Sequence, residues 1–139
     1  MENSPICSIQ AADTWSIRQK VMWPNKPLAY VQLEKDEMGT HFGYQINNTL
    51  VAVISLFISS EGIQFRKFAT LPQYQNQGIG TTLLHHTIHY AKMKHPNQRL
   101  WCNARTEKTS FYIKFGLLKT NTTFYRGVIA YTIMEMKLI

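Results

Sequence analysis

The sequence predicts an α+β fold whose elements follow the order β-α-β-β-β-α-β-α-β-β. Leu50 to Ile58 is almost entirely apolar, which is typical of a strand covered on both faces. The stretch after Gly78 instead repeats its apolar residues at helical spacing, as an amphipathic helix does; these residues are Ile79, Leu83, Leu84, Ile88 and Ala91. The chain of 139 residues is long enough for one domain, 1–139, with a core of its own.

The first elements are a strand and a helix. Pro5–Gln10, with Ile6 and Ile9 as its apolar residues, is a candidate first strand. Asp13 is a candidate N-cap for a helix that continues to Met22, because an aspartate oxygen accepts from free N–H groups at a helix start. Pro24 and Pro27 then end the helix.

A run of strands follows. Thr40–Ile46 and Leu50–Ser59 form a predicted hairpin around Asn47-Asn48, since asparagine tolerates the positive φ of a tight turn. A turn then leads into a strand over Ile63–Leu71. The segment Leu28–Met38 is compatible with either a short helix or a loop.

The remaining elements complete the order. A helix over Thr81–Lys94 ends before Pro96 and leads to a short strand. A second helix, over Thr106–Phe115, has Gly116 in position for a C-terminal cap. The predicted strands of this half are Gln98–Asn103 and a last hairpin of Leu117–Tyr125 and Val128–Leu138 around Arg126-Gly127.

The chain is basic, with 15 Lys and Arg against 8 Asp and Glu and a net charge of +7. The basic residues are scattered rather than gathered in runs, so neither a nucleic acid nor a membrane is an expected partner. No stretch is long and apolar enough to span a membrane, and the first residues, with Glu2 and Asp13, lack the pattern of a secretory signal. Two cysteines, Cys7 and Cys102, make no disulfide framework, so we expect a cytoplasmic protein.

The run Gln75-Asn76-Gln77-Gly78-Ile79-Gly80 joins a predicted strand to a predicted helix. Glycines there leave backbone N–H groups bare at a helix N-terminus, which is a favourable place for a phosphate. A tight turn alone is the competing interpretation. The dinucleotide fingerprint does not fit because Leu83 stands at its third glycine, and no Gly-Lys-Ser/Thr follows to make a P-loop.

The longer segment from Phe68 to Gly80 resembles the central motif of the GNAT acetyltransferase superfamily, in which Gln/Arg-x-x-Gly-x-Gly/Ala opens a helix. About thirty residues later, Phe111-Tyr112-Ile113-Lys114-Phe115-Gly116-Leu117 resembles the family's Phe-Tyr-x-Lys-x-Gly-Phe segment. The resemblance is good over about 63–138. It implies a mixed, mostly antiparallel sheet flanked by helices, and acetyl-CoA as cosubstrate.

The resemblance also implies which residues hold acetyl-CoA. Backbone N–H groups would receive the pyrophosphate and the strand before them would pair with the pantetheine arm. Many family members carry a cofactor-contacting Asn seven residues before the family's Tyr, but here that position is Arg105 and an Asn lies two residues earlier. The expected cofactor-binding residues are Phe68, Ala69, Thr70, Gln75, Asn76, Gln77, Gly78, Ile79, Gly80, Thr81, Asn103 and Arg105.

Tyr112 is the candidate catalytic residue, because the family places a general acid at this Tyr and a phenol can protonate a leaving thiolate. Packing of the helix against the sheet is the competing role. Candidate bases are Glu34, Asp36, Glu37 and His41, with a water chain as the alternative. We expect the acceptor between the Leu28–His41 segment and the final hairpin, in a cleft lined by these acids and by Phe124, Tyr125 and Tyr131.

The sequence therefore predicts an acetyl-CoA-dependent N-acetyltransferase in which a primary amine attacks the thioester directly in a ternary complex. The alternative is a non-catalytic acyl-CoA-binding sensor or scaffold. The sequence does not distinguish a polyamine, an aminoglycoside, an amino acid and a protein N-terminus as the acceptor. A homodimer is also possible. His85 and His89 lie four apart on a predicted helix, but the same face offers no further ligand, so no metal is expected.

Overall fold

The computed structural model describes residues 4–139, and Glu2 lies outside them. Seven strands form one mixed sheet in the order β1-β2-β3-β4-β5-β7-β6. Only the β4–β5 pair is parallel. The strands are β1 (Ile6–Ile9), β2 (Thr40–Ile46), β3 (Thr49–Ser59), β4 (Gly62–Thr70), β5 (Arg99–Arg105), β6 (Leu118–Arg126) and β7 (Ile129–Lys137). This α+β architecture confirms the predicted fold class and order.

Helices cover both faces of the sheet. On one face, α1 (Ala11–Met22) packs on β2, β3 and β4. On the other face, α2 (Ile79–Lys94) packs on the same three strands, and the short α3 (Thr109–Ile113) packs on β5, β6 and β7. The main core lies under α2, where the predicted stripe of Ile79, Leu83, Leu84, Ile88 and Ala91 is buried against the sheet. The sequence pattern therefore located the core-facing side of α2.

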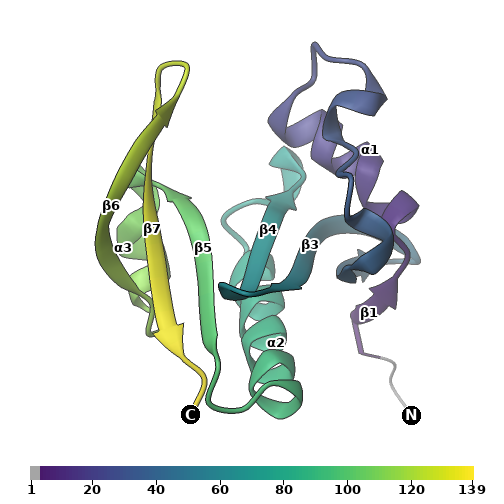
Figure 1. Ribbon diagram of the computed structural model, residues 1–139. Coiled ribbons are helices and arrows are strands. Elements are labelled where there is room, and N and C mark those ends of the chain that lie inside the picture. Colours follow the sequence, from purple (N-terminus) through teal and green to yellow (C-terminus); the bar gives the residue numbers. More distant parts are fainter. Residues whose placement is uncertain (1–3) are drawn as a thin grey trace.

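The sheet opens in its middle. β4 and β5 pair at only two positions, Ile63 with Leu100 and Gln64 with Trp101. Beyond them the strands separate, so that β1–β4 form one wing and β5, β7 and β6 form the other (Figure 1). The carboxyl ends of both strands face this opening, which sets the position of the candidate site.

Several element boundaries differ from the sequence prediction. The helix α1 begins at Ala11, and Asp13 is not its N-cap: its carboxylate accepts from the N–H of Gln10, the residue that precedes the helix. The segment before β2 holds two short 3₁₀ turns, Leu28–Val31 and Asp36–Met38.

Element boundaries in other parts of the chain also differ slightly from the sequence prediction. The predicted helix over 106–115 is a 3₁₀ turn, Thr106–Lys108, followed by α3, and Gly116 (φ +99°) caps its C-terminal end as expected. In β3 full burial holds for Val51 to Leu56, whereas Ile58 is 66% exposed. The helices do not extend over that end of the strand. Asn47 and Asn48 both take positive φ in the predicted hairpin turn.

Candidate functional site

The end of β4 carries a bulge that faces the opening. The register with β3 shifts after Val53–Ala69, so that Lys67 and Phe68 together lie opposite Ile54. Lys67 has φ +56°, an uncommon conformation for a residue with a side chain. Bulges re-aim side chains and interrupt pairing near functional sites. The bulge therefore separates β4 into a part that pairs with β5 and a part, Phe68 to Thr70, that borders the opening.

The N-terminus of α2 lies directly after this strand. The first helical hydrogen bond runs from the N–H of Thr82 to the carbonyl of Gly78, at 3.0 Å. The N–H groups of the residues before Thr82 precede that bond and have no partner inside the helix. Asn76 (φ +63°) and Gly78 (φ +81°) are both left-handed, and such residues form the concave N–H arrays that bind anions.

Two contacts fix this loop against β4. The amide of Gln75 donates to the carbonyl of Thr70, at 2.9 Å. A Cβ at Gly80 would lie 3.3 Å from the ring of Phe68 and 3.6 Å from Oγ1 of Thr70, whereas one at Gly78 would meet no atom within 4 Å. Gly80 thus allows the helix to approach the strand closely, and Gly78 leaves open space in front of the N–H groups. The structure brings together the predicted residues from Phe68 to Thr81.

Tyr112 lies on the other side of the opening, in α3. Its ring lies 5.8 Å from that of Phe65, and the neighbouring Phe111 ring lies 6.3 Å from Phe68, so aromatic contacts join α3 to β4. Its hydroxyl makes no hydrogen bond to any residue in the described range 4–139. Burial, together with the nearby Cys102 thiol, raises the pKa of Tyr112 although the charge of Arg105 lowers it. The phenol is therefore a retained proton source beside the opening.

The two polar residues predicted on β5 lie differently. Asn103 is half-buried, and its Oδ1 is buried without a hydrogen-bond partner among residues 4–139. Arg105 is exposed at the end of the strand, close enough to Tyr112 to affect its pKa. Cys102, which directly precedes Asn103, is buried in the core, where burial raises its pKa to about 12 and keeps the thiol protonated. A thiol that stays protonated is a poor nucleophile.

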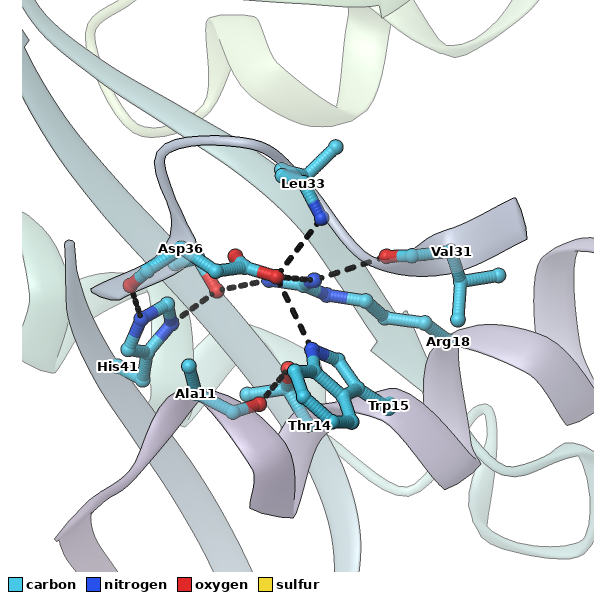
Figure 2. Close-up of polar contacts among 9 residues, drawn as sticks. Ala11, Thr14, Trp15, Arg18, Val31, Leu33, Asp36 and His41 are labelled. Carbon is cyan, nitrogen blue, oxygen red and sulfur yellow. Dashed lines mark hydrogen bonds and ion pairs between the residues drawn. The ribbon is translucent and has the colours of Figure 1, made fainter. Parts of the chain in front are cut away.

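Two of the four candidate bases belong to a buried network instead (Figure 2). Asp36 pairs with Arg18 and also accepts from the Trp15 indole, at 3.0 Å, and the Leu33 N–H, at 2.9 Å. Burial would raise the pKa of Asp36, but these hydrogen bonds and the charge of Arg18 outweigh it and lower the pKa. His41 is buried with Nδ1 2.7 Å from Ser55 Oγ and Nε2 2.8 Å from the Asp36 carbonyl. Neither side chain is free to take a proton from an acceptor.

Glu34 and Glu37, the other two, are exposed on the same segment. The predicted acidic lining of the acceptor cleft is therefore reduced, because Asp36 is neutralised inside the protein. Of the predicted aromatic lining, Phe124 and Tyr131 stack with ring centroids 5.4 Å apart, and Tyr125 is 73% exposed. The guanidinium of Arg126 lies 5.6 Å from the centroid of Phe124.

Two hollows mark the surface. The smaller, of about 290 Å³, lies beside β4 between Leu33, Phe57, Gln64 and Arg66. The larger, of about 430 Å³, lies at the far end of the β5–β7–β6 wing near Arg99 and contains none of the predicted site residues. The smaller hollow adjoins the site, because Arg66 immediately precedes the bulge.

Sequence reasoning missed the basic residues around the opening. Arg66 and Lys67 lie on β4 and Arg126 ends β6, so basic residues approach the opening from both wings. The adjacent Arg66-Lys67 pair stands between Phe65 and Phe68 in the strand directly before the motif. That pair was the available signal. Across residues 4–139, no three His, Cys, Asp or Glu side chains lie together as a metal site would require. No helix in that range is both long and apolar enough to cross a membrane.

The sequence matches a known family over most of the chain. The family model of the acetyltransferase (GNAT) domain matches residues 17–138. The chain belongs to the GNAT acetyltransferase family. It is therefore an acyltransferase enzyme, and the sensor alternative is not supported.

Similar proteins agree with this GNAT assignment. The N-acetyltransferase YitI of Bacillus subtilis (strain 168), itself uncharacterised, is 29% identical over 119 residues, which cover 78% of each chain. An acyl-CoA N-acyltransferase from Pseudomonas aeruginosa superposes with a TM-score of 0.79 at 14% identity, over 94% of this chain and 97% of that one. A GNAT acetyltransferase from Elizabethkingia anophelis with acetyl-CoA bound gives a TM-score of 0.73 at 20% identity, over 99% of each chain.

Proposed function

We propose that this protein is an acetyl-CoA-dependent N-acetyltransferase in which an amine attacks the thioester directly within a ternary complex. One observation carries the proposal: the opening between β4 and β5 has bare N–H groups of α2 at one side and, at the other, the Tyr112 hydroxyl, which has no hydrogen-bond partner among residues 4–139. A thioester of coenzyme A is long, with phosphates at one end and the thioester at the other. The N–H groups of α2 suit the phosphates, and the Tyr112 hydroxyl suits the sulfur. The Elizabethkingia neighbour with acetyl-CoA bound supports the choice of acyl donor.

The residues on either side of the opening fit such a donor. The N–H groups from Asn76 to Thr81 would hold the pyrophosphate, since Gly78 leaves the space in front of them open. The backbone of Phe68–Thr70, released from β5, would pair with the pantetheine arm as an added strand does. Asn103 Oδ1, buried without a partner in the described part of the chain, is a candidate acceptor for a donor on the same arm.

The chemistry then needs a polarised carbonyl and a proton for the leaving group. A backbone N–H of Phe68–Thr70 would donate to the thioester oxygen as negative charge develops on it. The amine nitrogen forms its bond to the carbonyl carbon, the carbon–sulfur bond breaks, and the sulfur takes the proton of Tyr112. The amine's proton leaves to solvent or to an exposed carboxylate, because Asp36 and His41 are engaged in the buried network.

The test measures binding and transfer separately. Calorimetry should detect coenzyme A binding to the purified chain, and a thiol reagent should detect coenzyme A release from acetyl-CoA in the presence of an amine panel. Binding together with amine-dependent release, and mass-spectrometric detection of the acetylated amine, is the expected result. Binding without release by any amine would contradict acetyl transfer, and absence of binding would contradict the site itself.

A further inference from the structure

We propose that the acceptor amine carries an anionic group, a carboxylate or a phosphate, which is bound by a basic cluster of Arg66, Lys67 and Arg126 at the opening of the sheet. This inference rests on the acetyl transfer proposed above and names the chemical class of its acceptor. It replaces the acidic cleft for a cationic amine that the sequence suggested.

The three side chains come from both wings of the sheet. Arg66 lies opposite Ser55 in the β3–β4 register, and Ser55 accepts from the buried Arg18 on the face covered by α1. Cross-strand neighbours share a face, so Arg66 lies on that face too. Lys67 follows in the bulge. Arg126 ends β6, and its charge lowers the pKa of both Arg66 and Lys67, which places it near them across the opening.

The cluster lacks counter-charges. The ion pairs of residues 4–139 are Arg18–Asp36 and Arg99–Glu135, so no described carboxylate neutralises Arg66, Lys67 or Arg126. Asp36, the acid whose charge raises the pKa of Arg66 and Lys67, already accepts hydrogen bonds from Nη1 and Nη2 of Arg18. Three mutually repelling cations with two of them half-buried form an unfavourable arrangement unless an anion binds between them.

The local backbone and surroundings fit a binding role. Lys67 holds a left-handed conformation that glycine or asparagine would adopt at lower cost, and such strain concentrates at functional sites. Arg66 lines the hollow of about 290 Å³ that adjoins the bulge; Lys35 and Glu34 also line it, so its rim carries one acid. Arg126 is held over the stacked rings of Phe124 and Tyr131, at 5.6 and 5.8 Å from their centroids.

The arrangement places the anion and the amine separately. An anion between the two wings lies beside the bulge, where the proposed thioester carbonyl is polarised by the backbone of Phe68–Thr70. An amine on the same molecule would reach that carbonyl from the α1 face, whereas the Tyr112 hydroxyl serves the sulfur from the α3 side. A polyamine would instead bring its charges against the three cations.

The experiment compares amines that differ only in charge. Glycine, β-alanine and 4-aminobutyrate are tested against their carboxamides, phosphoethanolamine against ethanolamine, and putrescine as a dication, with coenzyme A release as the measure. We expect kcat/KM of the best anionic amine to exceed that of its neutral twin by about 10-fold or more, as for a hydrogen-bonded charge. The carboxylate and phosphate arms distinguish the two sources of the anion.

Variants connect the preference to the cluster. Arg66→Gln and Arg126→Gln should each reduce the charged-to-neutral ratio several-fold, mainly through KM, while Lys92→Gln, at the exposed end of α2, removes the same charge and should leave the ratio unchanged. Equal rates with charged and neutral twins, or faster reaction with putrescine, would overturn the inference.

A binding measurement keeps this inference separate from acetyl transfer. Succinate and succinamide are titrated by calorimetry into the protein saturated with coenzyme A, so no reaction is required. Succinate should bind more tightly than succinamide, and Arg66→Gln should remove the difference. Equal binding of the two compounds would overturn the anion site even if amines are acetylated, and a succinate preference without any acetylation would contradict only the proposed transfer.

Discussion

Arg18 in α1 and Asp36 in the loop before β2 form a buried ion pair, in which two guanidinium nitrogens lie 2.8 and 2.9 Å from the two carboxylate oxygens. Arg18 is fully buried and Asp36 is 3% exposed. Arg18 also donates to Ser55 in β3, so the pair holds the Asp36–Met38 turn against the sheet. Asp36, buried in this pair, is not available to bind an acceptor amine.

Asp36→Asn should destabilise the protein strongly. The substitution leaves the Arg18 charge buried without its counter-ion, and breaking a buried pair in this way costs about 3 to 5 kcal/mol. Denaturant unfolding followed by circular dichroism measures the loss. Glu37→Gln, an exposed neighbour, is the matched control and should change stability little. A loss no larger than that of Glu37→Gln would show that the pair does not hold the segment.

The same pair should make stability depend on acid. The folded-state pKa of Asp36 lies below its ordinary value of 3.8, so its contribution is complete above that value. The contribution is lost as pH falls through the lower, folded-state pKa. The difference in unfolding free energy between the native protein and Asp36→Asn should therefore be constant near neutral pH and shrink in acid below 3.8. A difference independent of pH throughout this range would contradict the assignment.

Gly80→Asp should weaken coenzyme A binding by several-fold or more. The new side chain would lie against the Phe68 ring, 3.3 Å from the added Cβ, and would bring a negative charge to the end of α2 where we propose that the pyrophosphate binds. Gly80→Ala adds the volume without the charge and should cause a smaller loss. Calorimetry gives both affinities. Unchanged affinity in a folded Gly80→Asp protein would place the cofactor elsewhere.

Tyr112→Phe should lower kcat and leave acetyl-CoA affinity nearly unchanged. The loss of a general acid is typically worth about 10²- to 10⁴-fold, and we expect the lower end, as when water substitutes for the lost acid. Tyr90→Phe, on α2 outside the proposed site, also removes a phenol hydroxyl and serves as the control. Since the pKa of Tyr112 is raised above its ordinary value of 10.0, its own ionisation should cause no fall in kcat up to that pH. Full activity of Tyr112→Phe would assign the proton to solvent.

Succinate affinity should fall as pH rises through about 8. Burial and the charges of Arg66, Arg18 and Arg126 lower the pKa of Lys67 to about 8, although Asp36 opposes them. The protonated Lys67 side chain binds the succinate carboxylate. The site therefore loses one positive charge above that pH, while succinate stays ionised. Calorimetry from about pH 7 to about pH 9 measures the slope. Lys67→Gln should bind succinate weakly, with an affinity that does not change over this pH range. A native protein whose succinate affinity is equally independent of pH would exclude Lys67 from the site.

Much of the fold was predictable because local signals and tertiary packing agree. Asn47-Asn48 takes the positive φ that the turn needs, Gly116 caps α3, and the apolar stripe of α2 is buried. These features depend on residues close together in sequence. The main motif was predictable for the same reason, since Gly78 and Gly80 determine a local loop geometry.

The missed features depend on contacts between distant segments. In the sequence, Asp36 looks like one acid of an exposed loop. In the fold, α1 places Arg18 beside it, although the two residues are 18 positions apart in the chain. The bulge at Lys67 arises from the register with β3, which no pattern within β4 reveals. The Arg66-Lys67 pair is visible in the sequence, but Arg126 joins it only because the last hairpin returns to the opening, so the complete basic cluster could not be inferred from sequence order.

The short pairing of β4 with β5 also affects how the protein behaves before it meets its substrate. Past the two paired positions, both strands present backbone edges inside the sheet rather than at its outer rim. Exposed strand edges recruit other extended chains and lead to aggregation. A donor molecule bound as we propose would cover this edge, so the concentration of acetyl-CoA would then affect self-association of the enzyme as well as its rate.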